Sequence, residues 1–225
     1  MPRCTALLPL ALLSFWSASC LAQPLQAAPV DRAIAAYADG RLPEAARAFQ
    51  QLAAQGQALA RYNLAMMHLR GELPKASVRA AKRLLEQAAA QGFVRAELSL
   101  AELYEQGHLG RPDLIQAQHW FLRAAEHGSV DAQVAVGTAF FLGRGTAKDL
   151  AQAARWFREA AIGGDVGAQY LLASLYEHGD GVPRDLRLAR YWYDIAAQNG
   201  DEAAPFKLKE IDARIESEQQ LKDGA

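Results

Sequence analysis

Histidines and carboxylates are the residues of this sequence that could carry acid–base or metal chemistry, and their spacing favours neither. No two histidines have the short helical spacing that places both imidazoles on one metal ion. The five histidines are His68, His108, His119, His127 and His178. His178 follows Glu177 and His108 lies near Glu105, but a general acid–base pair needs a geometry that nearness along the chain does not supply. We therefore predict no catalytic site, no metal site and no cofactor.

The N-terminus has the order of features of a secretory leader. Arg3 precedes an apolar stretch from Ala6 to Trp16, and the small residues of the segment SASCLAQ follow. Cleavage after Ala22 would place small side chains where a signal peptidase accepts them, and Gln23 would begin the mature chain. The apolar stretch is shorter than the ~20 residues that a membrane-spanning helix needs. We predict that residues 1–22 are a signal peptide and that the mature protein is periplasmic or secreted, without a transmembrane segment.

Both cysteines, Cys4 and Cys20, lie within this leader. Simple cleavage leaves a mature chain without cysteine, which excludes disulfides, thiolate catalysis and thiolate metal ligands. The segment from Ser17 to Cys20 also resembles a lipoprotein box, although that pattern prefers Leu at the place of Ser17. The alternative is therefore a membrane-anchored lipoprotein whose first residue is an acylated Cys20.

Composition and charge exclude several other classes of protein. A chain with 51% hydrophobic and 22% charged residues can bury the core of a soluble domain. Lys plus Arg is 24 and Asp plus Glu is 25, and removal of the leader with Arg3 leaves 23 against 25, a net charge of −2. With no excess of basic residues, we predict no nucleic-acid partner. The segments GRGTAKD and GDGVPRD lack the full spacing of a phosphate-binding loop, so we interpret them as turns.

A 36-residue repeat is the strongest pattern in the sequence. Glycine recurs at this spacing in two rows, at Gly56, Gly92, Gly128, Gly164 and Gly200 and at Gly71, Gly107, Gly143 and Gly179. Alanine recurs likewise at Ala45, Ala81, Ala117, Ala153 and Ala189 and at Ala60, Ala96, Ala132, Ala168 and Ala204. The three tryptophans after the leader share the spacing, at Trp120, Trp156 and Trp192. A period of this length is typical of solenoids.

The recurring residues predict where each helix begins and ends. Between Asp149 and Ile162 the apolar residues recur at helical spacing, which indicates an amphipathic helix. Side-chain oxygens just ahead of such helices can accept hydrogen bonds from first-turn amides. These predicted N-caps are Ser77, Asp113, Asp149 and Asp185. The glycines from Gly56 to Gly200 are predicted to end the helices, because glycine adopts a left-handed conformation at the least cost. Another helix follows each glycine, with Ser129, Asp165 and Asp201 as its caps.

Counted along the chain, the pattern predicts an all-α fold of stacked helix pairs. The pairs fall at about residues 31–55, 59–91, 95–127, 131–163 and 167–199, and a last helix falls at about 202–220. We expect the alanines to lie where two backbones approach closely, and the aromatic pairs Trp120-Phe121, Trp156-Phe157 and Trp192-Tyr193 to fill the space between neighbours. One pair cannot bury its own apolar face, so stacking is obligatory. The prediction is a right-handed α-solenoid of about five helix-turn-helix repeats over residues 31–220 with a C-terminal capping helix, between a linker at 23–30 and a tail at 221–225.

The segment WFREAAIGGDVGAQYLLASLYEHGDGVPRDLRLARYWYDIAAQNGD closely resembles the Sel1-like repeat, a relative of the tetratricopeptide repeat. The resemblance covers about residues 59–200 and weakens to a tetratricopeptide-like first hairpin at 31–55. The second repeat departs most, with Leu84-Leu85 in place of the aromatic pair and GELPKAS in the loop, so we expect looser packing there. The resemblance implies an adaptor or regulatory role in which the repeats assemble protein complexes, frequently in bacterial envelopes.

In such solenoids the first helix of each pair lines the concave inner face, and the resemblance therefore implies where a partner protein or peptide binds. Several positions on this face are apolar and differ from repeat to repeat, and an exposed apolar patch suggests a partner. The alternative for Leu98, Val134 and Tyr170 is that they help neighbouring helices to pack. The predicted partner-binding residues are Tyr62, Met66, Leu69, Leu98, Glu102, Glu105, Val134, Thr138, Phe141, Tyr170, Ser174 and Glu177.

Three functions remain, and the first is the prediction: an exported scaffold or regulatory adaptor that binds a partner protein or peptide. The alternative is a structural element of the cell envelope or cell wall. A remote alternative is a hydrolase, since cysteine-rich relatives of the repeat have been linked to β-lactam hydrolysis. Those relatives carry a disulfide in each repeat, which this chain lacks after its leader, and no Ser-x-x-Lys motif or nucleophile elbow occurs.

Overall fold

Residues 28–223, the part of the chain that the computed structural model describes, form eleven helices and no strand. The helices are α1 (Pro29–Ala38), α2 (Leu42–Ala54), α3 (Ala58–Leu69), α4 (Val78–Ala89), α5 (Val94–Glu105), α6 (Leu114–Glu126), α7 (Val130–Leu142), α8 (Leu150–Ile162), α9 (Val166–His178), α10 (Leu186–Gln198) and α11 (Ala204–Asp223). Within this part, no helix is long and apolar enough to cross a membrane. The predicted signal peptide, its cleavage site and Cys20 lie outside the described residues.

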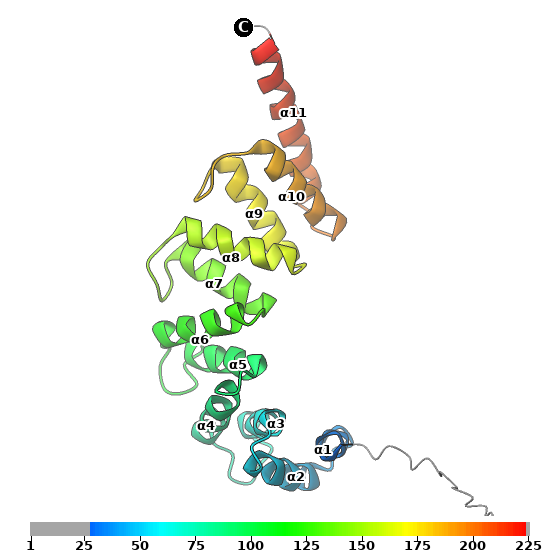
Figure 1. Cartoon of the computed structure of the whole chain (residues 1–225), viewed down its shortest axis with the longest axis vertical. Coiled ribbons are helices and arrows are strands. Elements are labelled where there is room, and N and C mark those ends of the chain that lie inside the picture. Colours follow the sequence, from blue (N-terminus) through cyan, green and yellow to red (C-terminus); the bar gives the residue numbers. More distant parts are fainter. Residues whose placement is uncertain (1–27, 224–225) are drawn as a thin grey trace, which may run out of the picture.

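The helices stack in pairs into an elongated, curved solenoid (Figure 1). Each helix packs on the helix before it and the helix after it, so that contacts run in chain order from α1 to α11. The first pair and α11 therefore lie at opposite ends of the stack (Figure 1). This arrangement confirms the predicted solenoid of five helix pairs with a terminal helix, and the helix bounds fall close to the predicted ones.

The predicted caps hold the helix N-termini. Asp149 Oδ1 accepts hydrogen bonds from the amides of Ala151 and Gln152, both at 3.0 Å. Because these amides have no partner inside the helix, the carboxylate fixes the residue at which α8 begins. Side-chain N-caps are confirmed at six predicted positions, Ser77, Asp113, Ser129, Asp149, Asp165 and Asp185. Asp201 lies three residues before α11 and accepts hydrogen bonds from the amides of Ala203 and Ala204.

Glycine is required where the chain turns between helices. Gly164 and Gly200 have φ angles of +94° and +98°, a left-handed conformation that side chains disfavour. Gly181 meets a second constraint, because a Cβ atom there would lie 2.2 Å from the carbonyl carbon of Leu150. The α9–α10 loop thus rests directly on the start of α8, and no larger residue fits.

The two alanine rows are the innermost residues of the stack. Ala45, Ala81, Ala153 and Ala189 are 0% exposed, as are all five alanines of the row from Ala60 to Ala204. A methyl group lets two helix backbones approach closely, and a larger side chain would force them apart. The prediction that these rows mark the closest approaches between helices agrees with their burial.

The aromatic pairs are only partly as predicted. The second member of each pair is buried, at 8% exposed for Phe121, 1% for Phe157 and 0% for Tyr193. Among the tryptophans of these three pairs, Trp156 is buried, at 5% exposed, whereas Trp120 and Trp192 are half-buried. Trp120 lies at the margin of the core, where the Arg123 guanidinium lies 5.1 Å from its ring centroid.

The second repeat is as tightly packed at its core as the others. Leu85 stands in place of the aromatic residue and is 0% exposed. The expectation of looser packing is therefore wrong at this position, because the smaller side chain is matched by its surroundings. The loop of this repeat does differ. The amides of Asp113, Asp149 and Asp185 each donate to a backbone carbonyl at the end of the preceding helix, whereas the Ser77 amide lies 3.3 Å from the His68 ring.

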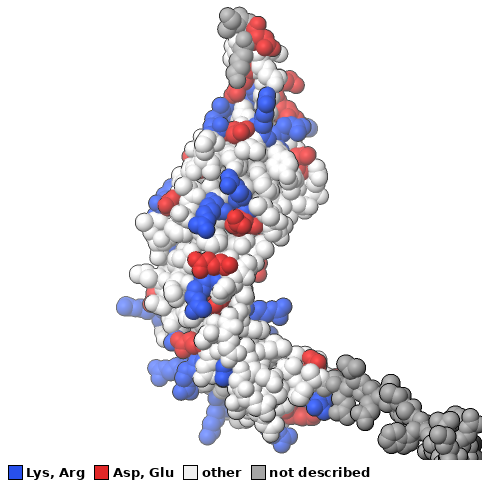
Figure 2. All heavy atoms as spheres, in the orientation of Figure 1, with Lys and Arg blue, Asp and Glu red and all other residues white. Residues whose placement is uncertain are grey.

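Charge is distributed unevenly along the stack. Residues 55–90 contain six Lys or Arg and two Asp or Glu, whereas residues 91–223 contain 14 Lys or Arg and 20 Asp or Glu. Basic side chains gather near the lower end of the view, at the level of α4 (Figure 2). A net charge close to zero therefore conceals a basic second hairpin, which is followed by acidic repeats.

Replacement of Trp156 by alanine tests the stacking. We expect Trp156→Ala to lower the free energy of unfolding by about 3–5 kcal/mol, because the indole fills space between two hairpins. Tyr191→Ala is the control, since this aromatic ring on α10 is 54% exposed, and its loss should change stability by less than about 0.5 kcal/mol. Urea titration followed by circular dichroism measures both. A cost for Trp156→Ala below about 1 kcal/mol would contradict the packing described.

Candidate functional site

The twelve predicted binding residues occupy three rows on the first helices α3, α5, α7 and α9, and we call this surface the first-helix face. One row contains Tyr62, Leu98, Val134 and Tyr170, the next Met66, Glu102, Thr138 and Ser174, and the last Leu69, Glu105, Phe141 and Glu177. Glu102 is exposed, Glu177 is buried and the remaining ten are half-buried. The face therefore offers partly covered side chains, with grooves between them.

The row that begins at Tyr62 serves packing to a large extent. The Tyr62 ring lies 5.3 Å from that of Phe93, and the Tyr170 ring lies 5.0 Å from that of Tyr193 in a T-shaped contact. Leu98 and Val134 pack against the core clusters of the hairpins around them. These four residues couple neighbouring helices and leave only part of each side chain accessible.

A groove of about 140 Å³ lies between α3 and the next hairpin, and we call it the first groove. Met66 and Leu69 line it from α3, and Glu102 lines it from α5. Its floor is mainly apolar and its outer end carries His108, whose ring nitrogen lies 2.7 Å from Gln106. The groove is small enough that a single side chain would fill it.

The same groove recurs one repeat later between α5 and the following hairpin, with a volume of about 130 Å³, and we call it the second groove. Glu105 and Thr138 line it at the places that Leu69 and Glu102 take in the first groove. Arg144 closes its end, 3.4 Å from Glu105. Recurrence at the repeat spacing shows that the grooves arise from the stacking geometry, while their lining residues are free to vary.

Phe141 takes the place of Leu69 and Glu105 in the fourth repeat, and its ring packs within the fold. Its centroid lies 6.5 Å from that of Phe157, and the Lys148 ammonium lies 5.8 Å from it. A bulky side chain at this place thus joins the packing between α7 and α8.

Carboxylates give the first-helix face its electrostatic character. Although Glu102 is exposed as a residue, partial desolvation of its carboxyl group raises its pKa above the ordinary value, and the nearby Asp131 and Glu105 add to the rise. A cation brought next to Glu102 would relieve this crowding of negative charge.

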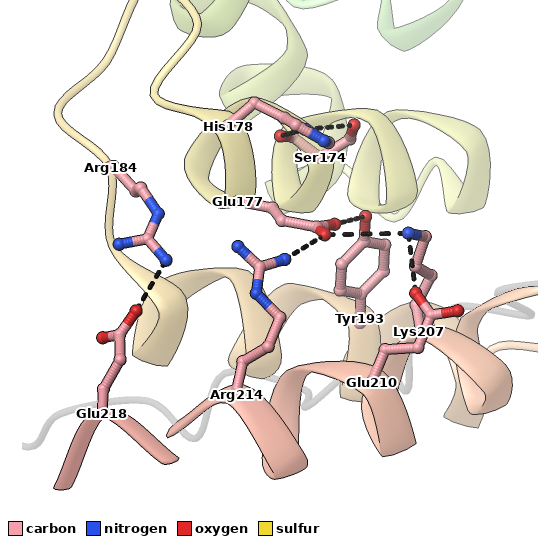
Figure 3. A network of polar contacts seen from close by, with 9 residues as sticks. All are labelled: Ser174, Glu177, His178, Arg184, Tyr193, Lys207, Glu210, Arg214 and Glu218. Atoms are coloured by element: carbon pink, nitrogen blue, oxygen red, sulfur yellow. Dashed lines mark hydrogen bonds and ion pairs between the residues drawn. The ribbon is translucent and has the colours of Figure 1, made fainter. Parts of the chain in front are cut away.

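Glu177 has a structural role that its place on the face did not predict. Its carboxylate is 3% exposed and lies between three partners that point toward it in Figure 3. Tyr193 donates a hydrogen bond at 2.8 Å, Arg214 donates one at 2.6 Å, and the Lys207 ammonium lies 3.7 Å away. Because Arg214 and Lys207 belong to α11, this carboxylate fastens the terminal helix to the last hairpin.

The surroundings of Glu177 set its ionisation. Burial by itself raises the pKa of this carboxyl group, but the hydrogen bond from Tyr193 and the charges of Lys207, His178 and Arg214 outweigh it, so that the pKa lies below its ordinary value. Burial and the same hydrogen bond raise the pKa of Tyr193. Glu177 is therefore ionised at neutral pH, and its charge is already neutralised within the fold.

Glu97 is a second buried carboxylate, and the sequence reading missed it. It is 0% exposed, with Oε1 3.1 Å from Arg123 Nη2 and Oε2 2.7 Å from His127 Nδ1. The replacement of glutamine by glutamate at this repeat position was the signal in the sequence. Gln133 and Gln169 occupy the equivalent places in the next repeats and donate hydrogen bonds to backbone carbonyls. A carboxylate cannot donate, so Glu97 requires cationic neighbours instead.

The histidines that follow carboxylates in the sequence have other partners in the structure. No three His, Cys, Asp or Glu side chains of this part are grouped so that they could hold a metal ion. The His178 ring lies 2.8 Å from the backbone carbonyl oxygen of Ser174, and His108 contacts Gln106. The carboxylates that precede these histidines are engaged elsewhere, Glu177 by α11 and Glu105 by Arg144.

Neutralisation of Glu177 should loosen the terminal helix. Since folding lowers its pKa, the carboxylate stabilises the fold above the pKa in the unfolded chain, about 4.3, and this stabilisation is lost as the pH falls through the folded pKa. We expect Glu177→Gln to cost about 2 kcal/mol at pH 7 and to flatten the dependence of the melting temperature on pH below about 5.

Glu105→Gln is the matched control, because its ion pair with Arg144 is solvent-exposed and contributes about 0–1 kcal/mol. Thermal melts from acid to neutral pH measure both variants. Equal losses for the two substitutions would show that Glu177 does not anchor α11.

Comparison with known proteins agrees with these features. The Sel1 repeat family model matches residues 58–93, 94–129, 130–165 and 166–201, each stretch beginning at or next to the start of a first helix. The crystal structure of a Sel1 repeat protein from Oxalobacter formigenes is 34% identical, with a TM-score of 0.67, over 75% of this chain and 49% of that one. The chain thus spans about half the length of that relative. No curated protein sequence matches.

Two further solved structures are similar to the chain. One is c5321, a protective antigen of uropathogenic Escherichia coli, at 26% identity over 80% of this chain and 46% of that one, with a TM-score of 0.45. The other is cysteine rich protein B of Helicobacter pylori, at 23% identity over 56% of this chain and 96% of that one, with a TM-score of 0.43. Sel1 repeat proteins are generally interaction scaffolds without catalytic activity. With four consecutive 36-residue matches over more than half of its length, this chain belongs to the Sel1 repeat family.

Proposed function

We propose that this protein is an exported scaffold or regulatory adaptor that binds a segment of a partner protein along the first-helix face. The observation that carries the proposal is the pair of equivalent grooves on this face. The two grooves lie one repeat apart and have similar volumes, whereas their lining changes from Leu69 and Glu102 in the first groove to Glu105 and Thr138 in the second. Grooves of similar size at the repeat spacing, each with its own lining residues, could bind successive side chains of one extended partner segment.

The chemistry of the grooves indicates what the partner segment carries. The apolar floors favour small aliphatic side chains, and the raised pKa of Glu102 favours a neighbouring Lys or Arg. Burial of the partner's apolar side chains in the grooves would contribute most of the binding free energy, and charges at the rim would orient the partner and raise the association rate constant. The partner segment is therefore one with aliphatic residues next to basic ones.

Export and the mode of attachment form the second part of the proposal. The order of charge, apolar stretch and small residues before Gln23 supports cleavage after Ala22. Acylation of Cys20 is the alternative, since the residues before it also resemble a lipoprotein box. Either form would place the solenoid outside the cytoplasm, where it would meet its partner.

Substitution in the grooves tests the partner-binding proposal. A photo-reactive amino acid in place of Thr138 should crosslink to one partner, which can then be purified. The double variant Glu102→Lys, Thr138→Lys should bind this partner with a dissociation constant about tenfold higher or more, a cost of about 1.4 kcal/mol. Glu159→Lys is the control, because Glu159 is exposed on α8, outside the face. Isothermal titration calorimetry measures the dissociation constants. Equal crosslinking from positions 138 and 159 would refute a specific binding face.

Mass spectrometry of the protein recovered from the cell envelope tests the leader. Signal peptidase cleavage should give an unmodified chain that begins at Gln23, and the Cys20→Ser variant should give the same product. A lipid-modified chain that begins at Cys20, lost in the Cys20→Ser variant, would instead establish the membrane-anchored form. An intact Met1 on the envelope protein would refute export by either route.

A further inference from the structure

A third and larger hollow lies away from the first-helix face, between α2 and the loop that joins α3 to α4. This open groove has a volume of about 530 Å³, and we call it the basic groove. Pro43 and Ala46 of α2 form one side of its floor, and Leu73 and Pro74 of the loop form the other. The floor is therefore apolar and wide enough for an aliphatic or aromatic side chain.

Comparison with the next repeat explains why the groove is open here. Ala46 stands where Lys82 stands one repeat later, and His68 stands where Tyr104 stands. In that repeat the Lys82 ammonium lies 5.9 Å from the centroid of the Tyr104 ring, so the long side chain covers the equivalent place. A methyl group and a smaller ring leave it uncovered at the first hairpin.

The polar groups that line the basic groove are hydrogen-bond donors or cations, and none is acidic. Arg47, Lys75, His68 and Gln50 line it. Burial lowers the pKa of His68, so this ring is neutral at pH 7. Its Nδ1 lies 3.3 Å from the Ser77 amide and accepts from it, which leaves the hydrogen on Nε2. The groove can thus donate to an anion from several sides.

Two basic residues that line the groove have no acidic partner. Arg47 and Lys75 are exposed and form no ion pair with any residue between 28 and 223. Arg79 and Arg83 follow on α4, and both are likewise exposed without an acidic partner in the described chain. Lys75, Arg79 and Arg83 belong to the basic second hairpin, whose excess of positive charge the rest of the stack does not share. Arg47 comes from α2 of the first hairpin.

We propose that the basic groove binds an acidic peptide segment of a partner protein, with one apolar side chain on its floor and flanking carboxylates on Arg47 and Lys75. Charge complementarity supports this occupant. The apolar floor can take an apolar side chain, and the cationic lining, which contains no acidic residue, can bind carboxylates on either side of it. The site is separate from the two grooves of the first-helix face and takes the opposite charge. The protein thereby holds two chemically distinct segments at two places on one rigid stack.

The probe is a fluorescein-labelled heptapeptide with one Leu between two runs of three Glu, and its binding to the full chain is followed by fluorescence anisotropy. We expect Lys75→Glu to raise the dissociation constant by about tenfold or more, because it replaces an attraction by a repulsion. Arg95→Glu is the control of equal charge, since Arg95 is exposed on α5 away from the groove, and it should leave binding unchanged.

Two further measurements separate the floor from the charges. Ala46→Gln fills part of the groove with a neutral side chain, and glutamine is chosen because Gln118 stands at the equivalent position of α6. This variant should bind the probe more weakly, with unchanged net charge and helix content. A peptide with Ser in place of Leu should bind more weakly to the wild type. The Glu102→Lys, Thr138→Lys variant should bind the probe as the wild type does, which keeps this test independent of the first-helix face.

Three outcomes would overturn the proposal. One is equal weakening by Lys75→Glu and Arg95→Glu, which would mean that only net charge matters. Another is equal affinity for the Leu and Ser peptides, which would show that the floor takes no part. The last is that a single-stranded oligonucleotide binds more tightly than the Leu peptide and that this binding is lost when Arg47 and Lys75 are replaced. The surface would then recognise phosphates rather than a peptide.

Discussion

The close contact of helix backbones at the alanine rows is the constraint on which the rest of the structure depends. Alanines such as Ala81 and Ala96 are 0% exposed, so each helix approaches its neighbours at the shortest distance that a side chain allows. Because the contact recurs every 36 residues, each hairpin takes nearly the same position on the one before it. A single repeated geometry thus sets the curvature of the stack and the position of every groove.

Fixed stacking leaves surface positions free to differ, and the differences give each hairpin its own character. Ala46 and His68 open a groove that Lys82 and Tyr104 cover one repeat later. The first and second grooves have similar volumes, yet Leu69 lines one where Glu105 lines the other. The solenoid therefore presents a groove lined by the carboxylate of Glu102 and a separate basic groove on the same scaffold. The binding sites arise from substitutions, while the architecture stays constant.

Glu97 and Glu177 enter the core of the stack at places where the fold supplies their partners. Glu97 is buried against Arg123 and His127, and Glu177 is buried against Tyr193 and two cations of α11. Such a carboxylate would be costly without opposite charges, so each one fixes the position of the helix that carries its partner. At Glu177 this contact closes the array at its C-terminal end.

The sequence by itself determined the helix pairs, their caps and their spacing, because a 36-residue period, N-caps such as Asp149 and glycines such as Gly164 act locally and recur. It also placed the twelve first-helix residues in three rows, since helical spacing fixes which residues share a face. Only the tertiary structure decided that Glu177 lies buried beneath α11 and that Ala46 leaves a groove open. Those outcomes depend on contacts between side chains of different helices, and neither the spacing nor the composition of the sequence determines such contacts.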